Sequence, residues 1–216
     1  MFKMSSKRPI SIKISALCGI IGPILGFIFI SCSIYLSDWF YWTENWLSDL
    51  GGIPENTSIW ASRGIASIIF NIGLILSGLI GVIFANSLRM IHILNNNKGR
   101  IGVFLLILDM FALCFIGIFP ETTGYLHTFV SVLFFFLIAL SLLIIGNVLR
   151  KQSMGKLGKF IIILGLISFC SFPFFAIPRP WGNNAITELI PIISLSIFTI
   201  LFGISLIKDK FVLILK

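Results

Sequence analysis

The sequence predicts an all-α polytopic membrane protein, a six-transmembrane-helix bundle with both termini on the cytoplasmic side. Of its 216 residues 57% are apolar and 11% are charged, against ~25% charged in ordinary soluble domains. The mean hydropathy is +1.06. Long apolar runs divide the chain, and Lys and Arg concentrate in alternate connections between them. This composition excludes a soluble enzyme, a DNA-binding domain and a disordered tail.

Each apolar run is long enough to cross a membrane as a helix, which takes ~20 residues. None shows the strict alternation of a barrel strand. Unpaired backbone groups are costly in lipid, so helices are the expected form. The chain, residues 1–216, is expected to be one domain. Its predicted spans are 14–36, 60–85, 101–119, 126–148, 157–177 and 186–207.

The basic residues predict the orientation. Of the sixteen Lys and Arg residues, all but Arg63 and Arg179 lie at the N-terminus, in the second-to-third and fourth-to-fifth connections, or in the C-terminal tail. The positive-inside rule places these segments in the cytoplasm. We therefore expect a multi-pass protein of the cell membrane with both termini cytoplasmic. Most of the acidic residues fall on the predicted outer side.

Two polar residues are predicted to lie deep in the membrane. Asn71 follows Arg63 by eight positions and Asp109 follows Arg100 by nine, which at 1.5 Å per residue is ~12–13 Å along a helix. An ionised Asp there costs at least ~2.5–3.5 kcal/mol, so Asp109 should face the interior and have a partner, and Asn71 is the candidate. The pair is either a proton or substrate site or a single hydrogen bond that joins two helices.

A second polar cluster is predicted where the helices converge at their outer ends. It combines residues of the first outer loop with residues that begin or join the later spans. Its members are Ser48, Asp49, Arg63, Glu121, His127, Arg179, Trp181, Asn183, Asn184 and Glu188.

The cluster has two interpretations. In the functional one, Arg63 and Arg179 hold an anionic group, and His127 acts as a general base that Asp49 or Glu121 orients. The catalytic candidates are then His127, Asp49, Ser48 and Glu121, and the ligand-binding candidates are Arg63, Asn71, Asp109, Arg179 and Glu188. In the other, His127 belongs to a surface network of polar side chains. One outer histidine and no outer cysteine do not make a usual zinc site, so no metal and no cofactor are expected.

Several of these residues carry a resemblance to a known family. They are Leu47–Gly51 after the first span, Phe70-Asn71, Gly117–Glu121, His127 and Glu188. Together they resemble the six-span membrane proteins catalogued as domain of unknown function 998, over nearly the whole chain. The resemblance implies six spans and candidate positions, but no reaction. A more distant similarity is to the FRAG/DRAM/SFK group, which is linked to lipid handling. The alkaline-ceramidase-like hydrolases also have polar sites among helices, but they use a histidine-rich metal set, which this chain lacks.

Three functions are compatible with the sequence. The leading one is binding of an outer-leaflet lipid or amphiphile in a polar pocket at the outer helix ends, with hydrolysis or group transfer on that lipid if the site is catalytic. The alternatives are a small proton-coupled transporter or channel that uses Asp109, and a structural subunit of a membrane complex. The expected partners are a membrane lipid and a small amphiphilic ligand, with no nucleic acid. The sequence leaves enzymatic activity and oligomeric state open.

Overall fold

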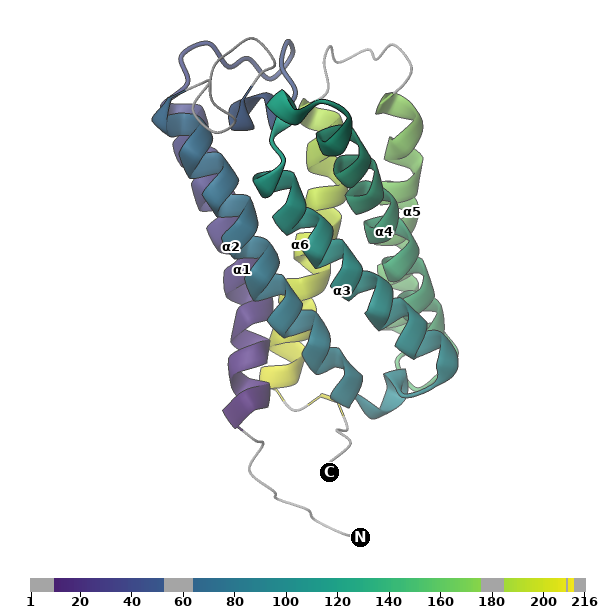
Figure 1. The fold of residues 1–216 in the computed structure, drawn as a ribbon. Coiled ribbons are helices and arrows are strands. Elements are labelled where there is room, and N and C mark those ends of the chain that lie inside the picture. Colours follow the sequence, from purple (N-terminus) through teal and green to yellow (C-terminus); the bar gives the residue numbers. More distant parts are fainter. Residues whose placement is uncertain (1–9, 53–63, 176–184, 209, 212–216) are drawn as a thin grey trace, which may run out of the picture.

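The protein is an all-α helical bundle (Figure 1). The structure, a computed structural model, describes residues 10–52, 64–175, 185–208 and 210–211. Within these ranges there is no strand, and six helices are long and apolar enough to cross a membrane. They are α1 (Ile10–Tyr35), α2 (Ile65–Ser87), α3 (Asn97–Ile118), α4 (Tyr125–Arg150), α5 (Gly155–Ser171) and α6 (Ala185–Ile207). The predicted fold class, a six-helix membrane bundle, is confirmed.

The helices form a closed ring. Each of α1 to α5 packs against the next helix in the chain, and α6 closes the ring between α5 and α1. The helices run up and down, so the start of α1 and the end of α6 lie together at one end of the bundle (Figure 1). We call this the terminal end and the opposite one the distal end. The first loop and the starts of α2, α4 and α6 lie at the distal end.

Three helix boundaries depend on glycine or proline. Gly124 precedes α4 with a φ of 60°, in the left-handed region that glycine tolerates best, and Gly64 precedes α2 with a φ of 65°. The predicted start of the second span at residue 60 lies outside the described residues. Helix α5 ends at Ser171 rather than at the predicted residue 177, because Pro173 has no N–H for a helical hydrogen bond. The chain continues as a 3₁₀ turn, Phe172–Phe175.

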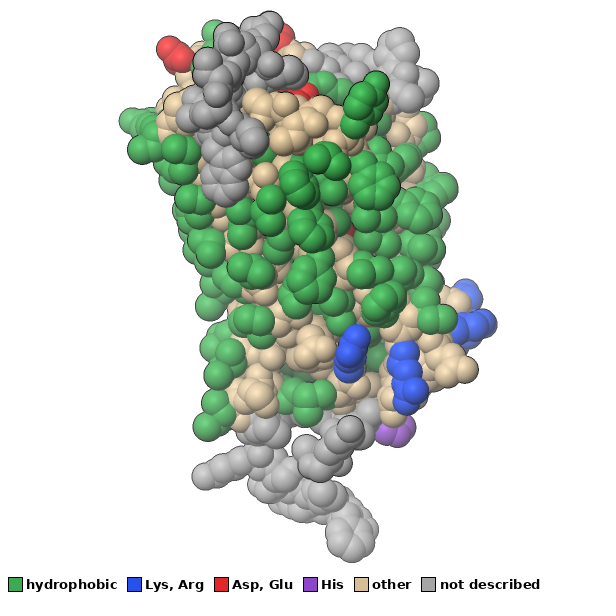
Figure 2. Space-filling model, viewed as in Figure 1, with side chains coloured by type: hydrophobic (Ala, Val, Ile, Leu, Met, Phe, Trp, Pro, Cys, Tyr) green, Lys and Arg blue, Asp and Glu red, His purple; other side chains and the backbone are tan. Residues whose placement is uncertain are grey.

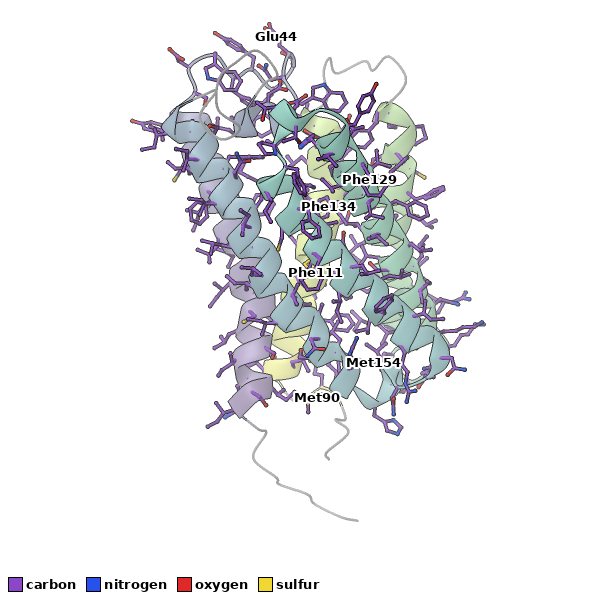
Figure 3. All side chains as sticks on the ribbon, in the orientation of Figure 1. Glu44, Met90, Phe111, Phe129, Phe134 and Met154 are labelled. Carbon is purple, nitrogen blue, oxygen red and sulfur yellow. The ribbon has the colours of Figure 1, made fainter. Side chains whose placement is uncertain are left out.

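The surface has the polarity of a membrane-spanning protein. Figure 2 shows hydrophobic side chains over the middle of the bundle, Lys and Arg toward the terminal end, and acidic side chains at the distal end. Among the described residues the band includes Ile14, Phe129 and Ile163, each more than half exposed. Glu44 lies in the first loop at the distal end (Figure 3). A continuous exposed apolar band indicates contact with lipid.

Helices α4 and α5 approach each other more closely than side chains allow. A Cβ atom on Gly158 of α5 would overlap the backbone of Arg150 and lie 2.6 Å from the carbonyl oxygen of Gly146. A Cβ on Gly146 of α4 would lie 2.8 Å from the amide nitrogen of Ile162. Small residues allow such backbone contact, which is the main source of helix association in lipid.

Candidate functional site

The first loop folds into the distal end of the bundle. Its 3₁₀ turn, Ser48–Gly51, is mostly buried and is held from two sides. The side-chain amide of Asn71 in α2 donates a 2.9 Å hydrogen bond to the carbonyl oxygen of Gly51. From the other side, Glu188 of α6 accepts hydrogen bonds from the loop backbone. The loop therefore joins α2 to α6 and brings its own polar residues to the helix ends.

Glu188 is the anchor on the α6 side. Its side chain lies in the first turn of α6 and is only 6% exposed. Oε2 accepts hydrogen bonds from the N–H groups of Leu47 and Ser48, the second at 3.3 Å, and the Ser48 hydroxyl also bonds to this carboxyl group. One buried and one partly buried backbone donor thus depend on one carboxyl oxygen.

Asp49 and Glu121 form a pair of carboxyl groups. Oδ2 of Asp49 accepts hydrogen bonds from the Asn45 amide at 3.1 Å and from the Trp46 N–H at 2.9 Å. Glu121 begins the 3₁₀ turn between α3 and α4, which contacts the Ser48–Gly51 turn. Burial raises the pKa of Glu121 to about 9, and a hydrogen bond to Asp49 and the charges of Asp49 and Glu188 act in the same direction. Glu121 is therefore protonated at neutral pH and donates a hydrogen bond to Asp49.

This raised pKa predicts a pH dependence of stability. The ordinary pKa of Glu is 4.5 and the folded value is about 9, so between these values the folded protein holds more protons than the unfolded chain. Stability should consequently fall as the pH rises through this range. Glu121→Gln cannot titrate, so the loss of Tm between pH 5 and pH 9 should be smaller in this variant than in the wild type. Thermal unfolding in detergent at pH 5, 7 and 9 measures the difference.

Asp38→Asn is the matched control for Glu121→Gln, because Asp38 is an exposed acid of the same distal end. It should keep the wild-type dependence of Tm on pH. Equal slopes of Tm against pH for the wild type and Glu121→Gln would show that the proton on Glu121 does not contribute to stability.

His127 is held in one orientation by two hydrogen bonds. The side chain is 7% exposed and lies in the first turn of α4. Nδ1 is 2.8 Å from the carbonyl oxygen of Phe119, which can only accept, so the neutral ring carries its hydrogen on Nδ1. Nε2 then accepts the hydroxyl hydrogen of Ser131, at 3.3 Å. The charge of Asp49 also acts on this imidazole.

Ser131 was not among the predicted site residues. Its sequence signal is the spacing, because residues four apart on a helix face the same side, as His127 and Ser131 do. Serine is too frequent in the spans of this chain for that spacing to single it out.

Asn71 and Asp109 do not form the hydrogen bond that we expected. Asn71 is bonded to Gly51, and its backbone oxygen packs against Gly117 of α3. Gly117 is eight residues from Asp109, ~12 Å along the helix. The expectation was wrong because each depth was counted along its own helix without the register between α2 and α3. Asp109 is fully buried, and neither of its carboxyl oxygens has a hydrogen-bond partner among the described residues.

The structure thus brings five predicted residues to one place, and Asn71 reaches it through Gly51. The five are Ser48, Asp49, Glu121, His127 and Glu188. Asp109 lies apart from them. Arg63 and Arg179, predicted to hold an anionic group, lie outside the described residues.

Two cavities lie in the bundle, and one of them borders this cluster. The distal cavity, about 40 Å³, is lined by Ser48, Ser131 and Glu188 together with apolar side chains. The central cavity, about 70 Å³, lies among α1, α2, α3, α4 and α6. A single water needs about 10–15 Å³ on this measure, so each cavity has room for several groups of the size of a water molecule. Both are lined by the same five apolar residues, Ile30, Leu74, Leu113, Phe134 and Ile192, and therefore adjoin each other.

The six long helices are apolar, whereas the cluster at the distal end is polar. Figure 3 labels Phe134 of α4, which lines both cavities. Six apolar helices with a polar, partly hollow distal end define a multi-pass integral membrane protein. The family model for a protein of unknown function, DUF998, matches residues 20–205, and the chain belongs to this family. The resemblance to domain of unknown function 998 seen in the sequence is confirmed. Neither the comparison with curated proteins nor that with solved structures finds a match.

Proposed function

We propose that the protein binds a single-chain amphiphile, with the polar end of the ligand beside Ser48, Ser131 and Glu188 and the apolar chain in the central cavity. The observation that carries this proposal is that the two cavities adjoin each other and share five apolar lining residues. Ligand sites are mostly apolar hollows with a few placed polar groups, and here Ser48, Ser131 and Glu188 are the polar residues in the lining of the distal cavity.

The wall that α1 contributes suits an alkyl chain. Gly19, Gly22 and Gly26 line the central cavity together with Pro23, Phe27 and Ile30, so α1 contributes both backbone and apolar side chains to this wall. Opposite them, Leu113 and Phe134 supply apolar surface. Burial of each CH₂ group contributes ~0.8 kcal/mol, so several methylenes in this hollow give a useful affinity.

The polar end of the ligand would lie on the non-cytoplasmic side. Lys98, Arg100, Arg150 and Lys151 are among the basic residues at the terminal end, and the positive-inside rule assigns such an end to the cytoplasm. The ligand is then a lipid or amphiphile of the outer leaflet. Arg63 and Arg179 keep their proposed role in holding an anionic group, and His127, Asp49, Ser48 and Glu121 are the proposed catalytic residues.

A larger side chain at the boundary between the two cavities should weaken binding of the amphiphile. Leu113 lines both of them, so Leu113→Phe should weaken the affinity for 1-O-hexadecylglycerol at least tenfold, because the larger ring occupies the path of the chain. This ether amphiphile has one chain and a neutral polar end. Binding is measured as the rise in Tm with ligand concentration, which follows from mass action.

Leu108→Phe is the matched control for Leu113→Phe. It makes the same change on an exposed, lipid-facing position of α3 and should leave the binding curve unchanged. The proposal is overturned if the wild type is not stabilised by the ether, or if Leu113→Phe binds it as well as the wild type does.

Proton-coupled transport through Asp109 is the second candidate. It is favoured by the burial of this carboxyl group without a hydrogen-bond partner among the described residues. Amphiphile binding has the stronger support, because neither of the two cavities is lined by Asp109.

A further inference from the structure

We propose that Ser131 and His127 are a nucleophile and its general base, and that they hydrolyse an ester bond of the bound amphiphile. This inference rests on the proposed function, because the amphiphile must bring its ester into the distal cavity. It adds a reaction class and a nucleophile, Ser131, to that binding site.

Ser131 differs from other helical serines of this bundle in its hydrogen bond. Serines inside helices usually donate to a backbone carbonyl three or four residues earlier. Those that do so here are Ser67, Ser87, Ser141, Ser168, Ser171, Ser194 and Ser196. The hydroxyl of Ser131 instead meets Nε2 of His127. An imidazole nitrogen can take up a proton, whereas a backbone carbonyl cannot act as a base at neutral pH.

The imidazole is oriented for this role from its other side. The Nδ1–H group of His127 donates to Phe119 O at 2.8 Å, which turns the lone pair of Nε2 toward Ser131. This is the arrangement of an activated nucleophile, in which a third group orients the base. The negative charge of Asp49 acts on the ring and stabilises the imidazolium that forms when the proton moves.

Ser131 is also the member of the pair that a ligand can reach. It lines the distal cavity beside Ser48 and Glu188, whereas His127 is not among the residues that line either of the two cavities. The ester of a single-chain amphiphile joins the polar end to the chain. If the polar end lies at the distal cavity and the chain in the central cavity, the ester falls next to Ser131.

The reaction has two steps. Oγ of Ser131 attacks the ester carbonyl carbon while Nε2 of His127 takes the hydroxyl proton. The bond from this carbon to the alcohol oxygen then breaks, and the alcohol leaves with the proton from Nε2. Water next attacks the acyl-serine and gives its proton to Nε2, and the return of that proton to Oγ releases the carboxylic acid. The net change is ester plus water to acid plus alcohol.

The test uses the full-length protein in detergent and a hexadecyl fluorophosphonate probe. An activated serine displaces fluoride from such a probe and keeps the phosphonyl group, which is located by peptide mass spectrometry. We expect the adduct on Ser131, no adduct at this position in Ser131→Ala, and labelling at least ~10²-fold slower in His127→Gln, the usual effect of losing a general base. Ser168→Ala should label like the wild type, because Ser168 bonds to the Leu164 carbonyl.

A pH profile of the wild type provides a readout that does not depend on the folding of His127→Gln. The labelling rate should fall in acid as Nε2 becomes protonated and level off once Nε2 is neutral, whereas a serine without a base reacts through its alkoxide and its rate would keep rising with pH. A wild type that is not labelled at Ser131, or is labelled there without this pH dependence, overturns the inference. Stabilisation by 1-O-hexadecylglycerol distinguishes the two proposals: if the ether binds and Ser131 is inert, only the catalytic inference fails.

Discussion

Gly158→Ala should lower the Tm of the protein by ~6–12 °C, corresponding to a loss of ~3 kcal/mol at 2–4 °C per kcal/mol. The added methyl group would overlap the backbone of Arg150 and approach Gly146 O to 2.6 Å. Backbone cannot rotate away as a side chain can, so α4 and α5 must move apart along their contact. Because dispersion at close approach is what holds helices together in lipid, the separation removes much of the α4–α5 interaction.

Gly155→Ala is the matched control, three residues earlier in α5. A Cβ atom there would meet the Arg150 carbonyl oxygen at 3.6 Å, an ordinary van der Waals contact. Alanine also favours the helix over glycine by up to ~1 kcal/mol, so this variant should be as stable as the wild type or slightly more so. Thermal unfolding in detergent compares the two variants. A Gly158→Ala protein with the Tm of Gly155→Ala would contradict the close packing of α4 and α5.

The fold was accessible from sequence because the membrane constrains it strongly. Apolar runs of the required length must be helices, and short connections make consecutive helices antiparallel neighbours. The same logic predicted that Asp49, Glu121, His127 and Glu188 meet at one end, since each lies where a span begins or a loop joins two spans. Their convergence follows from topology, without knowledge of packing.

Features that depend on packing could not be predicted in this way. The partner of Asn71 is set by the register between α2 and α3 and by the fold of the first loop, neither of which a hydropathy pattern contains. The cavities arise where side chains fail to fill the bundle, as at Leu113 and Phe134. The role of Ser131 depends on the rotation of α4, which turns His127 toward the end of α3.

Glu188→Ala is expected to have a second large effect, because it acts on the loop and on the pocket together. Removing the carboxyl group leaves the buried N–H group of Leu47 and the partly buried N–H group of Ser48 without their acceptor. Each unsatisfied donor costs ~1–3 kcal/mol, so the variant should lose ~3 kcal/mol, or ~6–12 °C in Tm. It should also bind 1-O-hexadecylglycerol at least tenfold more weakly, because Glu188 lines the distal cavity.

Glu188→Gln keeps a hydrogen-bond acceptor at this position but cannot carry a negative charge. Its amide oxygen can accept both backbone hydrogen bonds, so it should lose less than half as much Tm as Glu188→Ala does. Asp38→Ala, which removes an exposed acid of the same loop, should change neither Tm nor binding. If Glu188→Gln and Glu188→Ala lose equal stability, the negative charge rather than the hydrogen bonds holds the first loop. If Glu188→Gln and Glu188→Ala both have the Tm of the wild type, Glu188 does not hold the first loop against α6.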